Sequence, residues 1–379
     1  MKIFDIIVEN EFGEILSLTD NFNKFVTTYS GMNPPNASVS SDNFYGLDGV
    51  NISYMNVKER NVVLTIHITA DNVPKYRTLL YKFFKPYHKC KLYFSNAFKN
   101  IYIEGYPESI ECDQFTNDEQ VVASIICPEP YLLDQGETIL NGNITKTEPY
   151  NIFVDYDGEV TTDTECIMEV QKTTEFQNSY NSYLSGFSDS IKNLVVEHAN
   201  MARLVERDLI PDDDGTYYAD FNEYKDITSN FAGSKQSQLN DTQLQAAFNI
   251  YKLRNSYGIT DPVIHNFDET NVDESLNGSY SFNMEYRFIP GDKIVISSKP
   301  YNKKVRYYPE VTSAPSFNEQ AAINVDDDGG ISFLNCVRED SKWINIALMR
   351  QNIIAVGEID SASASVLFTM KYRNKYIGL

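Results

Sequence analysis

Residues 46–134 hold one amphipathic helix among short β-strands, and this order of elements constrains the fold more than any other feature. The helix is predicted to begin at Asn72, a good N-cap, with Pro74 in the first turn, where a missing N–H costs nothing. Apolar residues follow at helical spacing until Pro86 stops the helix. Strand-like segments flank it at 61–69, 91–94, 100–104, 109–114 and 120–127. The pattern predicts a small α+β domain built on a barrel or sandwich and ending near Tyr131.

The rest of the chain is mostly strand-like. Residues 31–43 are rich in Pro, Asn and Ser and are predicted to form a loop, and the polar residues 134–150 are predicted to connect two domains. Further strands are predicted at 150–160, 166–173, 281–289, 293–297, 305–308, 331–336, 343–347, 353–358 and 364–372. So many short strands, with turns between them, predict a two-sheet β-sandwich.

The strand pattern is interrupted between residues 184 and 275, where helices are predicted. Apolar residues from 191 to 205 keep a helical period, with Ser188 or Ser190 as cap. A second helix is predicted at 241–257, capped by Asp241. The sequence therefore predicts a mainly β protein with some α. The predicted units are an N-terminal domain at 1–133, a sandwich at 134–183 and 279–379, and a partly helical insertion at 184–278.

The charge balance excludes some partners. The chain has 53 acidic and 32 basic residues, a formal net charge of −21. Such a chain is not expected to bind nucleic acid specifically, because that binding is driven by Lys and Arg, nor to bind anionic membranes. No apolar run approaches the ~18 residues of a membrane span, and no signal peptide is recognisable. We expect a protein made and kept in a cytoplasm, unless a larger assembly carries it out.

No catalytic motif stands out in the sequence. The five cysteines are widely spaced, lack a Cys-x-x-Cys pair and are expected to be buried reduced thiols; they are Cys90, Cys112, Cys127, Cys166 and Cys336. The four histidines lack the spacing of a metal site; they are His67, His88, His198 and His265. Tyr and Phe are abundant, at 26 and 22 residues, as in strands and broad interfaces.

Two local features have some of the residues of a binding site. Residues 324–329 begin a calcium-loop pattern, but Asn335 stands where the loop needs a bidentate Glu, so a solvated turn is expected. The single Trp343 is expected to pack on one side of a strand rather than to stack on a sugar. We therefore predict no catalytic residue, no metal site and no cofactor.

Residues 46–131 resemble the N-terminal domain of the distal tail proteins of long-tailed bacteriophages. The matching segments are GLDGVNI, KERNVVLTIHIT, KYRTLLYKFF, KLYF, NIYIEGYPESIE and IICPEPYLLD. Near the C-terminus, FIPGDKIVISSKPYNKKV resembles the family's Pro-Gly-Asp turn, and KWINIAL and VLFTMKYRNKYIGL resemble its last strands. The agreement in order across two separate regions carries the resemblance.

The resemblance implies a structural protein of the virion tail, assembled in the bacterial cytoplasm. It implies an N-terminal split-barrel-like domain with one helix that forms a homo-hexameric ring, and an outer galectin-like β-sandwich. The ring would join the tail tube protein to the tail hub or tail-associated lysin and would anchor receptor-binding or other baseplate proteins. A contractile tail or a phage-derived bacteriocin fits equally well.

Residues 184–278 depart from the short form of this family and are expected to be a docking site or an added binding module. Two other functions were considered. One is a carbohydrate-binding adhesin that recognises host cell-wall glycans, and the other is a cell-wall hydrolase, for which no pair of carboxylates is singled out. The acidic balance also suggests the hypothesis that acidic residues line the ring channel and repel passing DNA.

Overall fold

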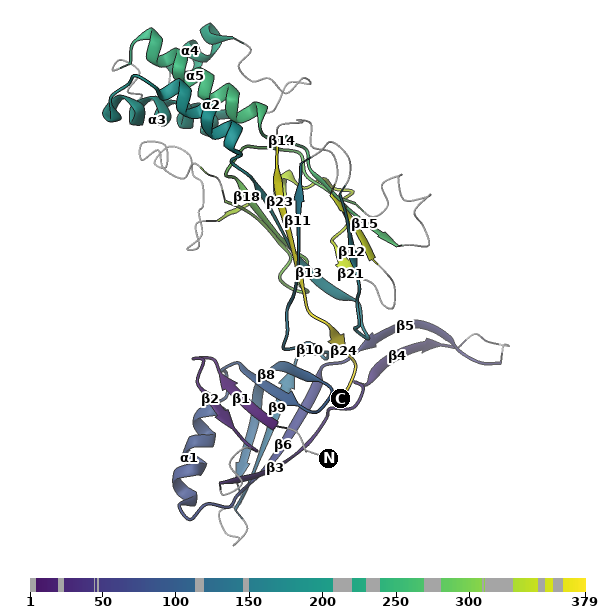
Figure 1. The fold of residues 1–379 in the computed structure, drawn as a ribbon. Coiled ribbons are helices and arrows are strands. Elements are labelled where there is room, and N and C mark those ends of the chain that lie inside the picture. Colours follow the sequence, from purple (N-terminus) through teal and green to yellow (C-terminus); the bar gives the residue numbers. More distant parts are fainter. Residues whose placement is uncertain are drawn as a thin grey trace.

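The computed structural model places three parts one after another along an elongated molecule (Figure 1). The strands around helix α1 form one end, layered strands form the middle, and a helical bundle forms the other end. The structure describes residues 5–19, 24–43, 45, 48–112, 119–145, 150–206, 220–229, 239–268, 281–308, 310, 330–346, 352–356 and 364–379.

The N-terminal unit is built on a nine-stranded sheet whose main path is β2-β1-β7-β8-β9-β6-β3. The strands are β1 Asp5–Asn10, β2 Ile15–Ser17, β3 Phe25–Ser30, β6 Arg60–Ile68, β7 Cys90–Ser95, β8 Asn100–Cys112 and β9 Gln120–Cys127. Buried residues alternate along β6, β7 and β9, so one face of the sheet supplies a single core. In the described residues β2 and β3 do not pair as strands. The Thr27 hydroxyl donates to the Leu18 carbonyl across that gap at 2.9 Å, which suits a split barrel.

Helix α1, Val73–Phe83, packs on this core where the sequence predicts it. The Asn72 side chain accepts a hydrogen bond from the Lys75 N–H at 3.3 Å, and a proline occupies the first turn. Leu80 and Phe83 are buried. Local capping and apolar spacing are therefore sufficient to locate this helix.

The middle unit is the predicted sandwich of antiparallel strands. One sheet has the order β11-β23-β13-β18-β19-β20 with β21 beside β13, and the other has the order β12-β22-β15-β16. Residues from both sheets, among them Ile152, Ile264, Met168 and Phe368, share one hydrophobic core. The bounds are β11 Thr138–Ile144, β12 Tyr150–Val154, β13 Thr162–Val170, β14 Ile259–Thr260, β15 Val263–Asp268, β16 Ser281–Asn283, β17 Arg287–Phe288, β18 Lys293–Ser297, β19 Lys304–Tyr308, β20 Ile331–Ser332, β21 Asn345–Ile346, β22 Asn352–Val356 and β23 Val366–Tyr372.

The helical bundle contains both predicted helices and two that were not predicted. Its helices are α2 Thr174–Leu184, α3 Asp189–Glu206, α4 Phe221–Ser229 and α5 Asp241–Ser256. Helix α5 is capped by Asn240 and not by Asp241, because Asn240 and Gln243 form a reciprocal capping box. Helical structure starts before residue 184, because α2 begins at Thr174. The bounds of the three units remain a proposal.

Four predictions of secondary structure were wrong. Residues 134–150 are not only a connection, because β11, Thr138–Ile144, pairs with β23. Residues 31–43 do not form only a loop, because β4, Ala37–Asp42, pairs with β5, Asn51–Val57. The strands predicted at 100–104 and 109–114 are one strand, β8. Its pairing with β9 shifts register next to Pro107, because proline has no N–H to donate to the neighbouring strand. The segment 331–336 is only β20 followed by a short 3₁₀ turn at Leu334–Cys336.

Candidate assembly surfaces

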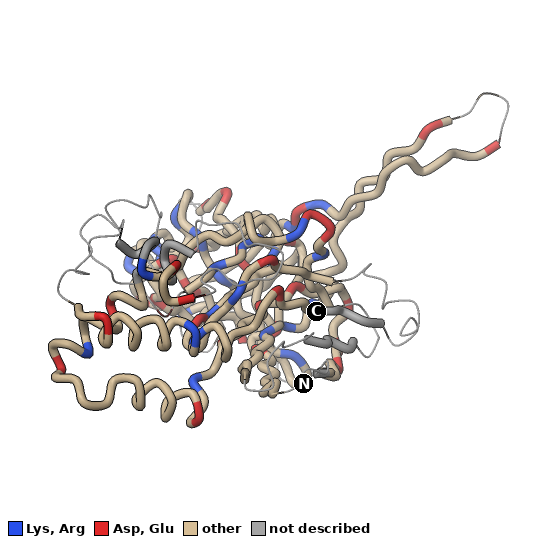
Figure 2. Tube along the Cα trace, turned by 90° about the horizontal axis from the view of Figure 1, so that it is seen from above, with Lys and Arg blue, Asp and Glu red and all other residues tan. Residues whose placement is uncertain are grey.

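The β4–β5 hairpin projects away from the body of the protein, and we call it the arm, residues 37–57 (Figure 1). Figure 2 shows it from above as a thin ribbon that carries few charged residues. Within the described part of the chain, β4 and β5 pair only with each other. Strand β5 alone has seven residues, about 23 Å of extended chain. Both outer edges of the arm therefore offer backbone groups to another chain.

The arm exposes apolar side chains. The exposed fractions are 52% for Val39, 55% for Ile52, 59% for Tyr54 and 62% for Met55. Val39 lies opposite Met55 in the antiparallel register. An isolated two-stranded ribbon is marginally stable in water, so a ribbon with these side chains gains stability by packing against something. Burying the exposed part of each of these four side chains would stabilise the bound arm by about 1 kcal/mol, or by about 4 kcal/mol for the whole arm.

The base of the arm is held by Arg60 of β6. The Arg60 side chain is 3% exposed, and its guanidinium donates to four carbonyl oxygens. They belong to Gly31 at 3.0 Å, Asn33 at 2.9 Å, Pro130 at 2.6 Å and Ile377 at 2.5 Å. Burial lowers the pKa of this guanidinium, but an arginine remains charged. One buried cation thus ties the chain entering the arm to the end of the N-terminal unit and to the C-terminal segment.

Gly31 shows how tightly the chain is packed at this base. Its φ is +88°, a left-handed conformation that favours glycine. A Cβ at this position would lie 2.0 Å from the carbonyl oxygen of Asn61 in β6. Because that atom belongs to the backbone of a paired strand, it cannot move away easily. The chain that leads into the arm is therefore closely packed against β6 at Gly31.

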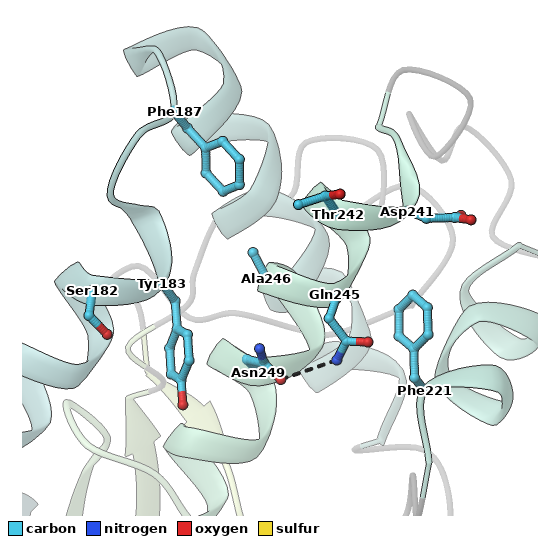
Figure 3. Close-up of a pocket in the computed structure, with 9 residues that line it drawn as sticks. All are labelled: Ser182, Tyr183, Phe187, Phe221, Asp241, Thr242, Gln245, Ala246 and Asn249. Carbon is cyan, nitrogen blue, oxygen red and sulfur yellow. Dashed lines mark hydrogen bonds between the residues drawn. The ribbon is translucent and has the colours of Figure 1, made fainter.

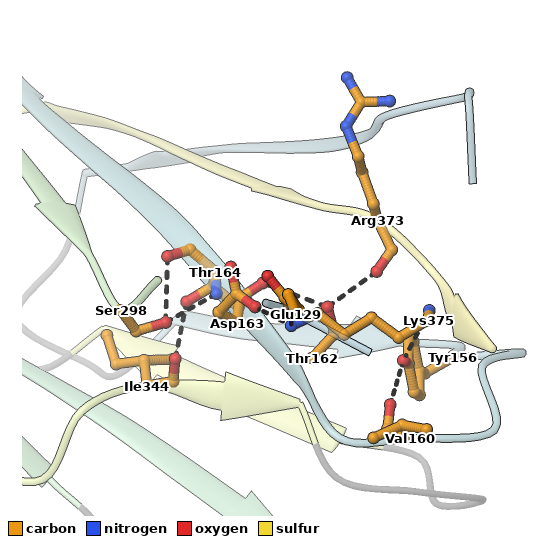
Figure 4. Close-up of polar contacts among 10 residues, drawn as sticks. All are labelled: Glu129, Tyr156, Val160, Thr162, Asp163, Thr164, Ser298, Ile344, Arg373 and Lys375. Carbon is orange, nitrogen blue, oxygen red and sulfur yellow. Dashed lines mark hydrogen bonds and ion pairs between the residues drawn. The ribbon is translucent and has the colours of Figure 1, made fainter. Parts of the chain in front are cut away.

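A second polar cluster joins the N-terminal unit to the sandwich (Figure 4). Lys375 lies in β24, Lys375–Tyr376, which pairs with β10, Leu132–Asp134. Its side chain is 5% exposed, and its Nζ lies 2.6 Å from Glu129 Oε1 and 2.5 Å from Asp163 Oδ1. Burial lowers the pKa of Lys375, but the two carboxylates outweigh burial and the pKa is raised. We call Glu129, Asp163 and Lys375 the joint cluster.

Further bonds fix the same joint. The Glu159 carboxylate accepts from Lys99 Nζ at 3.0 Å and from the Ile377 N–H at 2.9 Å. The Thr162 hydroxyl donates to the Arg373 carbonyl at 2.8 Å. These bonds cross from the N-terminal sheet to the sandwich and to the C-terminal segment. The two units therefore meet through hydrogen bonds and ion pairs.

The outer end of the helical bundle carries a shallow hollow of about 530 Å³ (Figure 3). Tyr183 of α2 and Phe221 of α4 line it together with Gln245 and Asn249 of α5. The Gln245 Nε2 donates to the Asn249 Oδ1 at 3.2 Å. Aromatic faces beside amide groups can hold a polar ligand that also has an apolar face.

The structure does not bring the histidines together. His88 contacts Glu11 at 2.8 Å, and buried His198 contacts the Tyr224 hydroxyl at 2.9 Å. His67 lies in β6, and the side chain of His265 lies outside the described residues. In the part of the chain that the structure describes, no group of three His, Cys, Asp or Glu side chains could hold a metal ion, and no helix is long and apolar enough to span a membrane.

The five cysteines are free thiols. Cys90, Cys127 and Cys166 are buried, and burial raises the pKa of each to about 12. Cys112 and Cys336 are half-buried, so the prediction of buried thiols fits three of the five.

Of the two local features, only Trp343 lies within the described residues. Trp343 packs against Phe282 with ring centroids 5.4 Å apart, but it lies just before β21 and not in a strand. Residues 324–329 lie outside the described residues, and Asn335 lies in the short 3₁₀ turn.

The arm and the role of Arg60 were not predicted from the sequence. The sequence indicates the arm only through the segments SVSSD and NISYMNV, which mix apolar and polar residues and do not pack on a core. Arg60 gave no signal, because its four partners are carbonyl oxygens that any residue could supply.

Comparisons with known proteins agree with these features. Residues 12–126 match the model of the phage tail protein RIFT-related domain. No curated protein matches the sequence. The crystal structure of the Dit protein (gp 19.1) of phage SPP1, described as a paradigm of the hub adsorption apparatus in phages that infect Gram-positive hosts, has a TM-score of 0.52 at 10% identity over 99% of both chains. A chain of the phage P2 baseplate in its activated conformation with Ca has a TM-score of 0.41 at 8% identity over 100% of both chains.

These results confirm the predicted fold class, mainly β with helices added. The matched domain includes α1, most of the N-terminal sheet and the arm. The likeness to the SPP1 protein extends over the sandwich as well. Residues 12–126 thus carry a phage tail protein RIFT-related domain, and the chain as a whole shares the fold of the SPP1 Dit protein.

Proposed function

We propose that this protein is a structural component of a phage tail tip whose copies close into a hexameric ring. The ring joins the tail tube to the hub and anchors receptor-binding or other baseplate proteins. The observation that carries the proposal is the arm, a ribbon with unpaired edges and exposed apolar side chains on a rigid base. The RIFT-related domain and the fold shared with the SPP1 protein support the same conclusion.

The arm suits a ring because it reaches in one direction. A contact between one surface of a protomer and a different surface of the next is heterologous, and it closes into a ring when the rotation between copies is right. The Arg60 bonds and the close approach at Gly31 fix the angle at which the arm leaves the body. A fixed angle sets a constant rotation between neighbours, which a closed ring requires.

We divide the work of the chain among three units. Residues 1–133 form the ring wall, the sandwich of residues 134–183 and 279–379 lies outside it, and the insertion at 184–278 offers a docking surface. Three separate hydrophobic cores support three units, but Ile259 and Ile264 belong to the core of the sandwich and Tyr376 to the core of the N-terminal unit. The net charge of −21 supports an acidic channel that repels passing DNA. An assembled ring with a neutral or basic channel would contradict the last point.

Mass photometry of the purified full chain tests the ring. The arm variant carries Val39→Ser, Ile52→Ser, Tyr54→Ser and Met55→Ser. The control variant carries four substitutions of apolar residues that are also exposed but lie elsewhere: Ile15→Ser, Phe98→Ser, Ile139→Ser and Phe153→Ser. We expect rings from the native chain and the control, and folded monomers from the arm variant. Rings that survive in the arm variant would show that the arm does not hold them.

A carbohydrate-binding adhesin is the second candidate, and the hollow on the helical bundle favours it. Tyr183 and Phe221 offer rings on which a sugar can stack, and the Gln245 and Asn249 amides offer hydrogen bonds. A glycan array probed with the full chain tests this function. Binding that is lost on Tyr183→Ala and Phe221→Ala would support the adhesin, and the absence of binding to cell-wall glycans would leave the structural role alone.

A further inference from the structure

The helical bundle is attached to one end of the sandwich at two chain crossings within the described residues (Figure 1). The first crossing, residues 171–173, joins β13 to α2, and the second, residues 257–258, joins α5 to β14. The bundle and the sandwich have separate hydrophobic cores, and at the crossings the Phe176 ring lies 5.6 Å from the Tyr257 ring, measured between centres. A unit attached in this way can swing unless further contacts hold it.

One carboxylate of the sandwich contacts a cation at each crossing. Glu310 Oε1 forms an ion pair with Lys172 Nζ in the first crossing. Glu310 Oε2 lies 4.0 Å from Arg254 Nε, in the last turn of α5 before the second crossing. The Glu310 side chain is 21% exposed and that of Arg254 is 4% exposed, so solvent ions screen these charges only weakly. We call Glu310, Lys172 and Arg254 the latch.

The Pro-Gly-Asp turn before β18 places Glu310 at the crossings. The buried Asp292 carboxylate accepts a hydrogen bond from the Glu310 N–H at 3.0 Å. The Gly291 N–H donates to the carbonyl of Val170, the last residue of β13, at 2.7 Å. Gly291 has a φ of +99°, and a Cβ added there would lie 2.7 Å from Glu310 Cγ and 2.9 Å from Lys172 Cε. The turn therefore leaves room for the ion pair and fixes the backbone on both sides of it.

Arg254 depends on Glu310 because its other partners are neutral. Its Nη1 donates to Asn200 Oδ1 in α3 at 2.7 Å, and its guanidinium lies 5.8 Å from the centre of the Tyr180 ring in α2. Among the described residues, Glu310 is the one acidic side chain that pairs with Arg254, and the 4.0 Å gap leaves Arg254 Nε and Glu310 Oε2 without hydrogen bonds. The contact is therefore an attraction between charges. If it were lost, a buried cation without a counter-charge would remain, and turning the bundle to bring Arg254 into water would relieve that cost.

We propose that the latch holds the helical bundle in one orientation on the sandwich, and that loss of the Glu310 charge releases the bundle to swing about its two crossings. The bundle carries the hollow lined by Tyr183 and Phe221, so the latch determines where that hollow is presented. The latch acts within one copy of the chain and does not require a ring.

Double electron–electron resonance between two spin labels tests the latch in the full chain. The labels are attached through p-azidophenylalanine in place of Asn193 in α3 and Ser332 in β20, which are both exposed, so the native cysteines stay unlabelled. Labelled chain is diluted into an excess of unlabelled chain, so that only distances within one copy are read. We expect a narrow distance distribution in the native chain and one at least about twofold wider in Glu310→Gln, because an amide attracts neither cation.

The matched control is Glu165→Gln. The Glu165 carboxylate also pairs with a lysine, Lys371 at 3.3 Å, and is 27% exposed, but both residues lie within the sandwich sheet. The control should therefore keep the narrow distribution of the native chain. Equal widths in Glu310→Gln and in the control, or a broad distribution already in the native chain, would overturn the latch.

Hydrogen exchange read by mass spectrometry separates release of the bundle from a general loss of stability. In Glu310→Gln we expect faster exchange at the two crossings and unchanged exchange within α3 and β18, because the bundle and the sandwich keep their own cores. Exchange that becomes faster throughout α3 and β18 would show that Glu310 supports the whole fold, and it would contradict a latch between two intact units.

Discussion

The substitution Lys375→Met removes the cation of the joint cluster and leaves two carboxylates behind. Asp163 is the one that matters, because its side chain is only 15% exposed, whereas that of Glu129 is 40% exposed. Removing one partner of a buried ion pair costs about 3–5 kcal/mol. Because one of the two carboxylates is well solvated, we expect a loss near the lower end, about 3 kcal/mol.

Urea unfolding, followed by far-UV circular dichroism and by the emission of Trp343, measures this loss. The double variant Lys375→Met with Asp163→Asn should have a free energy of unfolding about 1–2 kcal/mol higher than Lys375→Met alone, because it no longer contains the unpaired buried charge. Lys82→Met is the matched control, because Lys82 pairs with Glu14 at an exposed site and should cost less than about 1 kcal/mol. The reasoning is refuted if Lys375→Met costs no more than Lys82→Met, or if Asp163→Asn adds to the loss.

The pKa of Lys375 fixes the pH range in which this stabilisation acts. Its folded pKa is raised above the ordinary value, so the stabilisation is fully present below about pH 10.4 and is lost as the pH rises through the folded pKa. The measurement at neutral pH therefore reports the whole effect.

Three further outcomes are expected. Burial lowers the pKa of His198 to about 4, so the neutral imidazole stabilises the fold fully above about pH 6.5. The free energy of unfolding should fall by up to about 3 kcal/mol as the pH drops from 6.5 toward 4. Ellipticity at 222 nm should therefore fall in acid, and His198→Leu should flatten the pH profile. Gly31→Ala should lower the free energy of unfolding, measured by calorimetry, by about 2 kcal/mol or more. Gly13→Ala should lower it by about 1 kcal/mol, because Gly13 has a φ of +77° but no atom lies within 4 Å of the added Cβ. Equal losses would contradict the clash with Asn61. A thiol reagent at pH 8 should modify Cys112 and Cys336 in the native protein and spare the other three until urea is added.

Local signals explain what the sequence could predict. Helix α1 has a capping asparagine, a proline in its first turn and another proline after its end, all within a few residues. Strands β6 and β9 are rich in β-branched residues, and more and less buried side chains alternate along them because one face meets the core. Helix α2 was missed although Thr173 caps it and Phe176, Tyr180 and Leu184 follow at helical spacing, because TEFQNSYNSYL is rich in Asn and Ser. It forms because Phe176 and Leu184 are buried by the surrounding structure.

The candidate surfaces could not be predicted, because they depend on distant residues or on exposure. Lys375 meets a carboxylate 246 positions away in the sequence, and the Arg60 guanidinium reaches a carbonyl 317 positions away. The arm lacks the burial pattern by which strands are recognised, because both of its faces are exposed. Its apolar residues are explained by a partner outside the chain rather than by a core within it.

Cryo-electron microscopy of the purified full chain tests the central claim most directly. The account predicts closed rings of six copies, in which the arm of each copy packs on the next and Val39, Ile52, Tyr54 and Met55 become buried. Particles that remain monomeric at high concentration, or rings in which the arms stay in solvent, would contradict it.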